Sequence, residues 1–193
     1  MTRVGIVIGT TRPGRLGPQV AQWVEKAAGA CEGAAFETVD LADYGLPLFD
    51  EPGLPRSGVY AHDHTRAWSA KIAELDGFVF VTPEYNWSIP AALKNAIDFV
   101  YNEWNDKAAG LVGYGSNVGG ARALDHLRLV AGAVQLKTVY TQVNLSLLTD
   151  FEQYTVFRPA ERHDAALRRM LTEVITLADA LAPLRRATPG GHR

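Results

Sequence analysis

A loop near the amino terminus carries groups that proteins use to hold a phosphate. Between Gly9 and Gly17 it has two threonine hydroxyls, the guanidinium groups of Arg12 and Arg15, and the free N–H groups of the helix expected after it. Helix amino termini and guanidinium groups both favour an anion. The loop lacks the Gly-Lys-Ser/Thr ending of a Walker loop and the spacing of a dinucleotide fingerprint. A single phosphate is therefore one interpretation, and a surface turn with two solvated arginines is the other.

Two further loops add flat side chains and glycines. Tyr85 and Trp87 offer aromatic faces on either side of Asn86, whose amide both donates and accepts hydrogen bonds. The alternative for these rings is an aromatic corner of the core. The glycines between Gly115 and Gly120 would let the backbone come close to a ligand, although glycine turns after strands are common. Together the groups on the three loops suit a mononucleotide with a large planar ring, and FMN fits this description better than ATP.

Short apolar runs predict the strands that position these loops. Phe78–Val81 has four large apolar residues and predicts a strand buried on both faces, which Pro83 ends because it has no N–H to donate. Val4–Ile8 is apolar throughout in the same way. Phe36–Leu41 and Leu136–Val143 instead alternate, which is typical of half-exposed edge strands.

Helical patterns separate the strands, and this alternation predicts an α/β fold. With a weaker strand at Leu111–Tyr114, the five strands form a doubly wound parallel sheet with helices on both faces. Central strands one and three and edge strands two and five give the order 2-1-3-4-5, which is the flavodoxin-like order. The three loops then gather at the carboxyl edge of the sheet. Helices are predicted at Val20–Ala28, His64–Leu75, from Pro90 onward, at Ala121–Ala131 and at Leu167–Leu181.

The helix after the second loop has an unusually wide apolar arc. Ser88 is expected to cap it, with Pro90 in its first turn. Its apolar residues favour a second buried surface against a partner subunit, and the alternative is a large Trp104 that caps the core. The arc consists of Leu93, Ile97, Val100 and Trp104, with Ala92, Ala96 and Phe99 beside it.

The rest of the chain is expected to belong to one domain. Residues 1–184 form this domain, and residues 185–193 are predicted to be a flexible tail. Asp43–Tyr60 and Leu145–Arg158 are predicted to be irregular, and a loop as long as the first tends to be functional.

The composition limits the function classes. The chain has 193 residues and a formal net charge of −2, so nothing argues for a nucleic-acid partner. Cys31 is the single cysteine, which excludes an internal disulfide and favours a reducing cytoplasm. No signal peptide or membrane span is expected. His62 and His64 flank Asp63, but no third ligand is evident nearby, so no metal site is predicted.

Three motifs stand out in the loops and the elements beside them: Gly-Thr-Thr-Arg-Pro-Gly-Arg at 9–15, Pro-Glu-Tyr-Asn-Trp-Ser-Ile-Pro-Ala-Ala-Leu-Lys-Asn-Ala-Ile-Asp at 83–98, and Gly-Tyr-Gly-Ser-Asn-Val-Gly-Gly at 113–120. In these motifs the sequence resembles the NADPH-dependent FMN reductase family, which includes NAD(P)H:quinone reductases and azo- and chromate-reducing flavoproteins. The resemblance covers residues 3 to about 180.

The resemblance implies a role for each loop in binding FMN. Many family members have Ser and Asn where this chain has Arg15 and Gly17, and Gly where it has Ser88, so the phosphate contacts and the space over the ring are expected to differ. The implied phosphate ligands are Thr10, Arg12, Arg15 and the Leu16 backbone. The residues that would border the isoalloxazine ring are Pro83, Glu84, Tyr85, Asn86 and Trp87, with Gly115, Ser116 and Gly119 at its other edge.

The function that the resemblance implies is an FMN-dependent NAD(P)H oxidoreductase. It would pass two electrons by a ping-pong cycle from NADPH or NADH to a small-molecule acceptor, such as a quinone, free flavin, an azo compound or a metal oxyanion. The flavin carries the chemistry, so no side chain need act as a nucleophile. The resemblance also implies a homodimer or tetramer, with Pro47–Tyr60 in the pocket wall. A non-catalytic electron carrier or a flavin-binding regulatory protein is the alternative.

Overall fold

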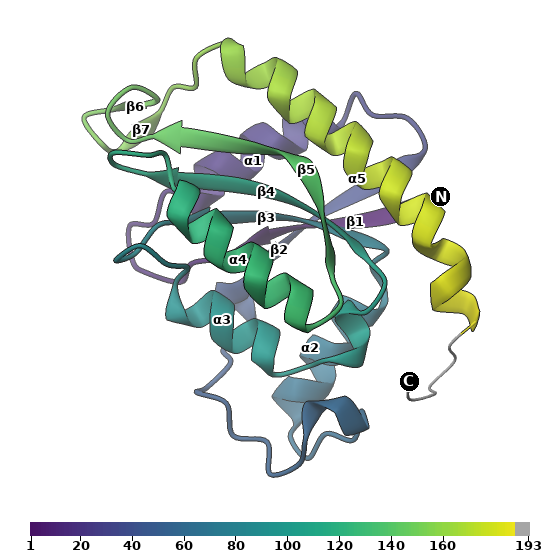
Figure 1. Cartoon of the computed structure of the whole chain (residues 1–193). Helices are drawn as coiled ribbons and strands as arrows, with labels where there is room; N and C mark the ends of the chain where they lie inside the picture. The colour runs from purple at the N-terminus through teal and green to yellow at the C-terminus, as the bar shows by residue number, and fades with distance from the viewer. Residues whose placement is uncertain (188–193) are drawn as a thin grey trace.

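The centre of the molecule is a five-stranded parallel sheet, seen in a computed structural model that describes residues 1–187 (Figure 1). Its strands are β1 (Thr2–Ile8), β2 (Ala34–Asp40), β3 (Gly77–Pro83), β4 (Ala108–Gly115) and β5 (Lys137–Ser146). They lie in the order β2-β1-β3-β4-β5, which confirms the predicted order. Every residue of β3 and β4 is buried, whereas the edge strands β2 and β5 are partly exposed.

Helices cover both faces of the sheet (Figure 1). The α-helices are α1 (Gly17–Ala28), α2 (Asp63–Ala73), α3 (Ala91–Asp98), α4 (Ala121–Ala133) and α5 (Arg162–Ala187), and the short 3-10 helices are η1 (Leu41–Tyr44), η2 (Pro55–Ser57) and η3 (Asn102–Trp104). On β3, Phe78 and Phe80 pack into the core beneath α2, α3 and α4, and Val79 and Val81 pack into the core beneath α1 and α5. Successive strand side chains face opposite sides, so a strand covered on both faces is apolar throughout.

The predicted helix from Pro90 to Trp104 is in fact two elements. Helix α3 ends at Asp98, and Trp104 lies in η3 with its side chain fully buried between Trp68 and Phe78. The indole N–H of Trp104 donates to the Ile97 carbonyl at 3.1 Å. Leu93, Ile97, Val100 and Phe99 are at most 1% exposed within this single chain. The apolar arc is therefore occupied by the protein's own core, and it gives no evidence for a partner subunit.

The predicted start of α3 was also wrong. Pro90 is the N-cap residue and Ala91 the first helical residue, so Ser88 lies outside the helix. The Ser88 hydroxyl instead lies 2.8 Å from Nδ1 of His126 in α4. A capping serine is a local signal, and here the contact with another helix determines where the side chain points.

The segment predicted as irregular after β5 contains a small hairpin. Strands β6 (Phe151–Glu152) and β7 (Val156–Phe157) pair antiparallel. The buried carboxylate of Asp150 organises this segment, because it accepts hydrogen bonds from the backbone N–H groups of Ser146 and Ala160 and contacts Nε2 of His163 at 3.0 Å. Two-residue strands carry too little pattern to be seen in a sequence.

Helix α5 extends to Ala187, past the predicted start of the tail at Arg185. Arg185 is anchored, because its Nη2 donates to Asp76 at 2.9 Å and its Nη1 to the carbonyl of Asp106 at 3.0 Å. The rest of the predicted tail, residues 188–193, lies outside the described residues. Among residues 1–187 no helix is both long enough and apolar enough to cross a membrane.

Candidate functional site

The three predicted loops meet at the carboxyl edge of the sheet, because they follow the neighbouring strands β1, β3 and β4. The first loop is joined to β3 by the Gly9 N–H, which donates to the Val81 carbonyl at 2.8 Å. The second is joined to β4 by the Glu84 N–H, which donates to the Tyr114 carbonyl at 2.9 Å. The predicted convergence of the loops is thus present.

The first loop leads into helix α1, where Pro18 has no N–H and the Gln19 N–H donates to the Leu16 carbonyl at 3.1 Å, so the helix dipole rather than free N–H groups favours an anion here. Leu16 occupies the N-cap position and supplies no side-chain hydrogen bond to the terminal N–H groups. Thr10 is buried, and its hydroxyl lies 3.1 Å from the hydroxyl of Tyr85 in the second loop. Arg12 is exposed, and the described residues supply no ion-pair partner for it. An uncapped helix start beside an unpaired guanidinium suits an anion.

Arg15 is held differently from Arg12. Its guanidinium forms an ion pair with Asp40 at the end of β2, and both side chains are largely buried. Its Nε is buried and has no hydrogen-bond partner among the described residues. A buried donor without a partner is costly, so this nitrogen marks a position where an acceptor is missing. The charge of Arg15 is nevertheless balanced by Asp40, which leaves Arg12 as the more available cation of the loop.

A tyrosine that was not predicted to contribute to the site lies under the first loop. Tyr114 is the penultimate residue of β4, 4% exposed, and its hydroxyl would lie 3.4 Å from a Cβ added to Gly17. Burial raises the pKa of Tyr114, and the neighbouring Tyr85 raises it further, so its hydroxyl stays protonated. Its position just before a rim loop was the signal that could have identified it.

The second loop is a tight hairpin turn with an exposed indole. The N–H groups of Tyr85 and Ser88 donate to each other's carbonyls at 2.9 and 3.0 Å, and the two residues between them, Asn86 and Trp87, have positive φ angles of 49° and 69°. This combination is typical of a type I′ turn. Trp87 is 69% exposed, so it does not form a core corner. Pro83, in contrast, is buried as the last residue of β3.

Glu84 and Arg122 hold this indole in place. The Glu84 carboxylate is mostly buried; it accepts from Nη1 of Arg122 at 3.1 Å and from the Arg122 backbone N–H at 3.2 Å, in the first turn of α4. The guanidinium of Arg122 in turn lies 4.9 Å from the centre of the Trp87 ring. The carboxylate of Glu84 is thus committed to α4 and its backbone N–H to β4, so its carbonyl is the polar group that remains for a ligand.

The glycines of the third loop serve close packing within the chain. A Cβ on Gly115 would lie 3.0 Å from the Gly120 nitrogen, and a Cβ on Gly119 would lie 3.0 Å from the Leu145 nitrogen in β5. The close backbone approach expected at these two positions is therefore to the protein itself. Ser116 lies between them and is exposed at the rim.

Together the rim offers an anion site and a flat aromatic surface. Its anion end is the start of α1 with Arg12, and its aromatic end is Trp87 in the hairpin turn. The part of the chain that the structure describes brings together no group of three or more His, Cys, Asp or Glu side chains that could hold a metal ion. The geometry thus provides two kinds of contact suited to a phosphorylated planar ligand.

Comparison with known proteins gives consistent matches. The sequence profile described as NADPH-dependent FMN reductase matches residues 2–150. A Schizosaccharomyces pombe protein named NAD(P)H-dependent FMN reductase is 39% identical over 183 residues, covering 92% of this chain and 91% of its own. A Solanum tuberosum protein named NAD(P)H:quinone oxidoreductase is 43% identical over 101 residues, covering 51% of this chain and 50% of its own.

Among solved structures, the fold is similar to that of FerB, a flavoenzyme NAD(P)H:(acceptor) oxidoreductase from Paracoccus denitrificans. The TM-score is 0.73, the identity is 21%, and the match covers 93% of this chain and 98% of FerB. At this identity the likeness concerns the fold, and it agrees with the flavodoxin-like strand order.

Proposed function

Because the chain belongs to the NADPH-dependent FMN reductase family, an oxidoreductase family that uses FMN and NAD(P)H, we propose that it passes two electrons from NAD(P)H to quinones or related acceptors. Free flavin, azo compounds and metal oxyanions are the other acceptors we expect, and we expect donor and acceptor to use the site in turn. The observation that carries the proposal is the meeting of an uncapped helix start and an exposed, braced indole at one sheet edge.

The residues at the rim fit FMN. The start of α1, Thr10 and Arg12 would hold the phosphate, and the unpartnered Nε of Arg15 supplies a further donor. The backbone of Pro83–Trp87 and the indole of Trp87 would border the ring, with Ser116 at its other edge. Some side chains predicted for the site, such as Arg12, thus remain free for a ligand. Others, such as Glu84, are bound to neighbouring elements and fix the loops in position.

The protein's own contribution is binding, orientation and electrostatics. When bound, FMN would supply the redox chemistry of hydride acceptance and electron release. The helix start and Arg12 favour the doubly charged phosphate, which fixes the cofactor at one end. The braced indole keeps a flat surface exposed to solvent, where a nicotinamide or a quinone could stack. No side chain is required to act as a nucleophile.

An assay of the purified protein tests this proposal. We expect the protein to bind FMN, with a flavin absorption band after gel filtration, and to oxidise NADPH or NADH steadily when a benzoquinone is added. Parallel double-reciprocal plots at several quinone concentrations would support the alternating use of one site. A protein that binds FMN but oxidises no NAD(P)H with any acceptor would instead be a carrier or a regulatory protein.

We also propose that the protein forms a homodimer or tetramer, as the sequence resemblance implies. The long loop between η1 and α2 supports this, because Leu48, Leu54 and Val59 are 83%, 79% and 75% exposed within the single chain. Several exposed apolar side chains on one segment are typical of an interaction surface. Sedimentation equilibrium measures the oligomeric state, and a monomer at micromolar concentration would contradict this part of the proposal.

A further inference from the structure

A large cavity lies at the end of the sheet opposite to the three loops. Its volume is about 630 Å³, which is within the range of small-molecule sites. It is bordered by η2 of the long loop, by the residues just before β3 and β4, and by the end of α5. None of the predicted flavin-binding residues lines it, so it is separate from the site described above.

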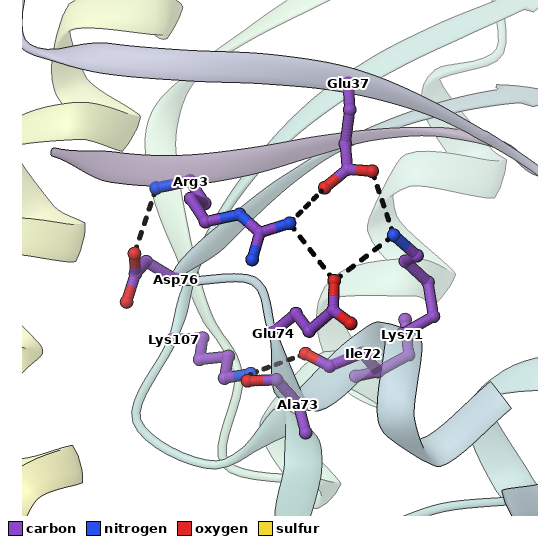
Figure 2. A network of polar contacts seen from close by, with 8 residues as sticks. All are labelled: Arg3, Glu37, Lys71, Ile72, Ala73, Glu74, Asp76 and Lys107. Carbon is purple, nitrogen blue, oxygen red and sulfur yellow. Dashed lines mark hydrogen bonds and ion pairs between the residues drawn. The ribbon is translucent and has the colours of Figure 1, made fainter. Parts of the chain in front are cut away.

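One wall of this cavity contains a buried ammonium group. Lys107 is 5% exposed, and its Nζ donates to the Ile72 carbonyl at 2.6 Å and to the Ala73 carbonyl at 3.3 Å at the end of α2 (Figure 2). In the described chain no carboxylate lies within ion-pair distance of this nitrogen, although Arg3, Glu37, Lys71 and Glu74 form a connected ion-pair network nearby. The carbonyls satisfy the hydrogen bonds, but they supply no net charge.

Further cations line the same cavity. Arg185 is already paired with Asp76, so that pair adds no net charge. Arg56 projects from η2 and lies 4.5 Å from the centre of the Tyr101 ring. Within residues 1–187 it donates one of its five N–H groups, to the Tyr101 hydroxyl at 2.9 Å. Arg186 lines the cavity from the last turn of α5 and is exposed. As far as the described residues show, two arginines with donors to spare border a cavity that also contains an ammonium group without an ion-pair partner.

Acidic groups at the cavity are mostly engaged elsewhere. Asp76 accepts from Arg185 and from the Arg3 backbone N–H. Glu103 accepts from the Tyr60 hydroxyl at 2.9 Å and from the Ser69 hydroxyl. Asp106 also lines the cavity, and no ion pair or hydrogen bond within the described residues engages its carboxylate. The lining thus contains four cationic side chains, Arg56, Lys107, Arg185 and Arg186, against three carboxylates, which leaves an excess of one positive charge.

We propose that this cavity is a second ligand site, which binds a small organic molecule through a phosphate or carboxylate group held by Arg56 and Arg186 and stabilised by Lys107. A planar guanidinium is well suited to such oxyanions, and the nearby ammonium adds favourable charge. The Tyr101 ring beside Arg56 and the amides around it offer contacts for the rest of the ligand. The site would also fix η2, and with it one end of the long loop.

Calorimetric titration of the FMN-supplemented protein with pyrophosphate, inorganic phosphate and citrate tests this site. Excess FMN keeps the anions away from the first loop, and an Arg12→Gln variant checks that they do not bind there. We expect saturable binding of at least one anion, with each of Arg56→Gln and Arg186→Gln weakening it about 10-fold, as for one lost charged hydrogen bond. Arg168→Gln removes an exposed charge from the same helix outside the cavity, and it should leave the binding unchanged.

Two results would overturn the proposal. One is the absence of saturable binding of all three anions at millimolar concentration. The other is binding that Arg56→Gln and Arg186→Gln leave as strong as in the wild-type protein, which would place the anion elsewhere. Since both arginines lie at the surface, these variants are expected to fold, and circular dichroism and melting curves verify it. Either result would overturn the second site without contradicting the proposed flavin site, because FMN binding is measured in a separate experiment.

Discussion

At the scale of single residues, two buried charges respond to pH in opposite ways. Lys107 is buried, its hydrogen-bond partners in the described part of the chain are carbonyls, and burial lowers its pKa to about 7. For Asp150 burial acts to raise the pKa, but hydrogen bonds from the N–H groups of Ser146 and Ala160 and the nearby His163 outweigh it, so the pKa is lowered. Lys107 therefore opposes folding while it is charged, and Asp150 favours folding while it is charged.

Lys107→Met tests the first of these effects. In the wild-type protein the cost of burying the ammonium is fully present below about pH 7 and disappears as the pH rises toward 10.5, the value of a free lysine. Between these limits the unfolded chain holds more protons, so the free energy of unfolding rises with pH, by at most about 1.4 kcal/mol per pH unit. Lys107→Met should remove this rise.

Urea denaturation at several pH values measures this slope. The exposed Lys26 gives the matched control, and Lys26→Met should keep the wild-type slope. Equal slopes in the wild-type protein and in Lys107→Met would show that the lysine stays charged in the fold.

Asp150→Asn tests the second effect. The change removes the charge but keeps the shape of the side chain, and we expect a loss of roughly 2 kcal/mol at pH 7, because hydrogen bonds to a buried carboxylate are weakened. The pKa of Asp150 is lower in the folded protein than the value of 3.8 expected in the unfolded chain. The charge of Asp150 therefore stabilises the fold fully above pH 3.8, and this stabilisation is lost as the pH falls through the folded-state pKa. The two proteins should thus converge in stability on acidification. Asp125→Asn, on the exposed side of α4, is the control.

At the scale of elements, the hairpin turn that holds Asn86 and Trp87 has two requirements. The backbone of the turn requires a positive φ angle at both residues. The proposed flavin site in addition requires the side-chain amide of Asn86. Asn86→Ala would disturb both, because alanine in a left-handed conformation costs about 1 kcal/mol. Asn86→Gly keeps the backbone conformation available and removes only the amide.

We therefore expect Asn86→Gly to weaken FMN binding about 10-fold with little change in the melting temperature of the FMN-free protein. Asn86→Ala should weaken FMN binding and also lower that melting temperature. Fluorescence titration with FMN and thermal melts of the FMN-free proteins separate the two. Unchanged FMN affinity in both variants would mean that the turn does not contact the cofactor.

At the scale of the whole molecule, cofactor binding at the carboxyl edge should stabilise the entire domain. A ligand that binds only the folded state, at a free concentration 100 times its dissociation constant, raises the free energy of unfolding by about 2.7 kcal/mol. For a chain of this length that corresponds to a rise in melting temperature of roughly 5 to 10 °C. Riboflavin, which lacks the phosphate, should give a much smaller rise if the start of α1 and Arg12 hold that group. Equal shifts with FMN and riboflavin would contradict the role of the first loop.

Much of the architecture could be predicted because it follows from burial. Fully apolar runs indicated the central strands β1 and β3, and alternating runs indicated the edges β2 and β5, so the strand order followed. The loops at the carboxyl edge then followed from the order. The break after Asp98 could not be predicted, since the apolar pattern continues through it without glycine or proline.

The candidate site was proposed from residue types, and the structure adds charge partners within it that the sequence did not indicate. Arg15 lies beside Asp40, and Glu84 lies beside Arg122, in pairs that are 25 and 38 residues apart in the sequence. Such distant pairs depend on the packed fold, and no local pattern indicates them. The same is true of the cavity around Lys107, which is assembled from five separate segments.

The left-handed backbone at Trp87 has a consequence for engineering. Tryptophan is poorly suited to a φ of 69°, whereas glycine or asparagine adopts it easily. A laboratory selection for heat tolerance alone would thus favour replacing this indole. The selected variants would be more heat-stable but would lack the exposed indole on which a ring can stack. Variants changed at position 87 should therefore be the first in such a library to be assayed for enzymatic turnover.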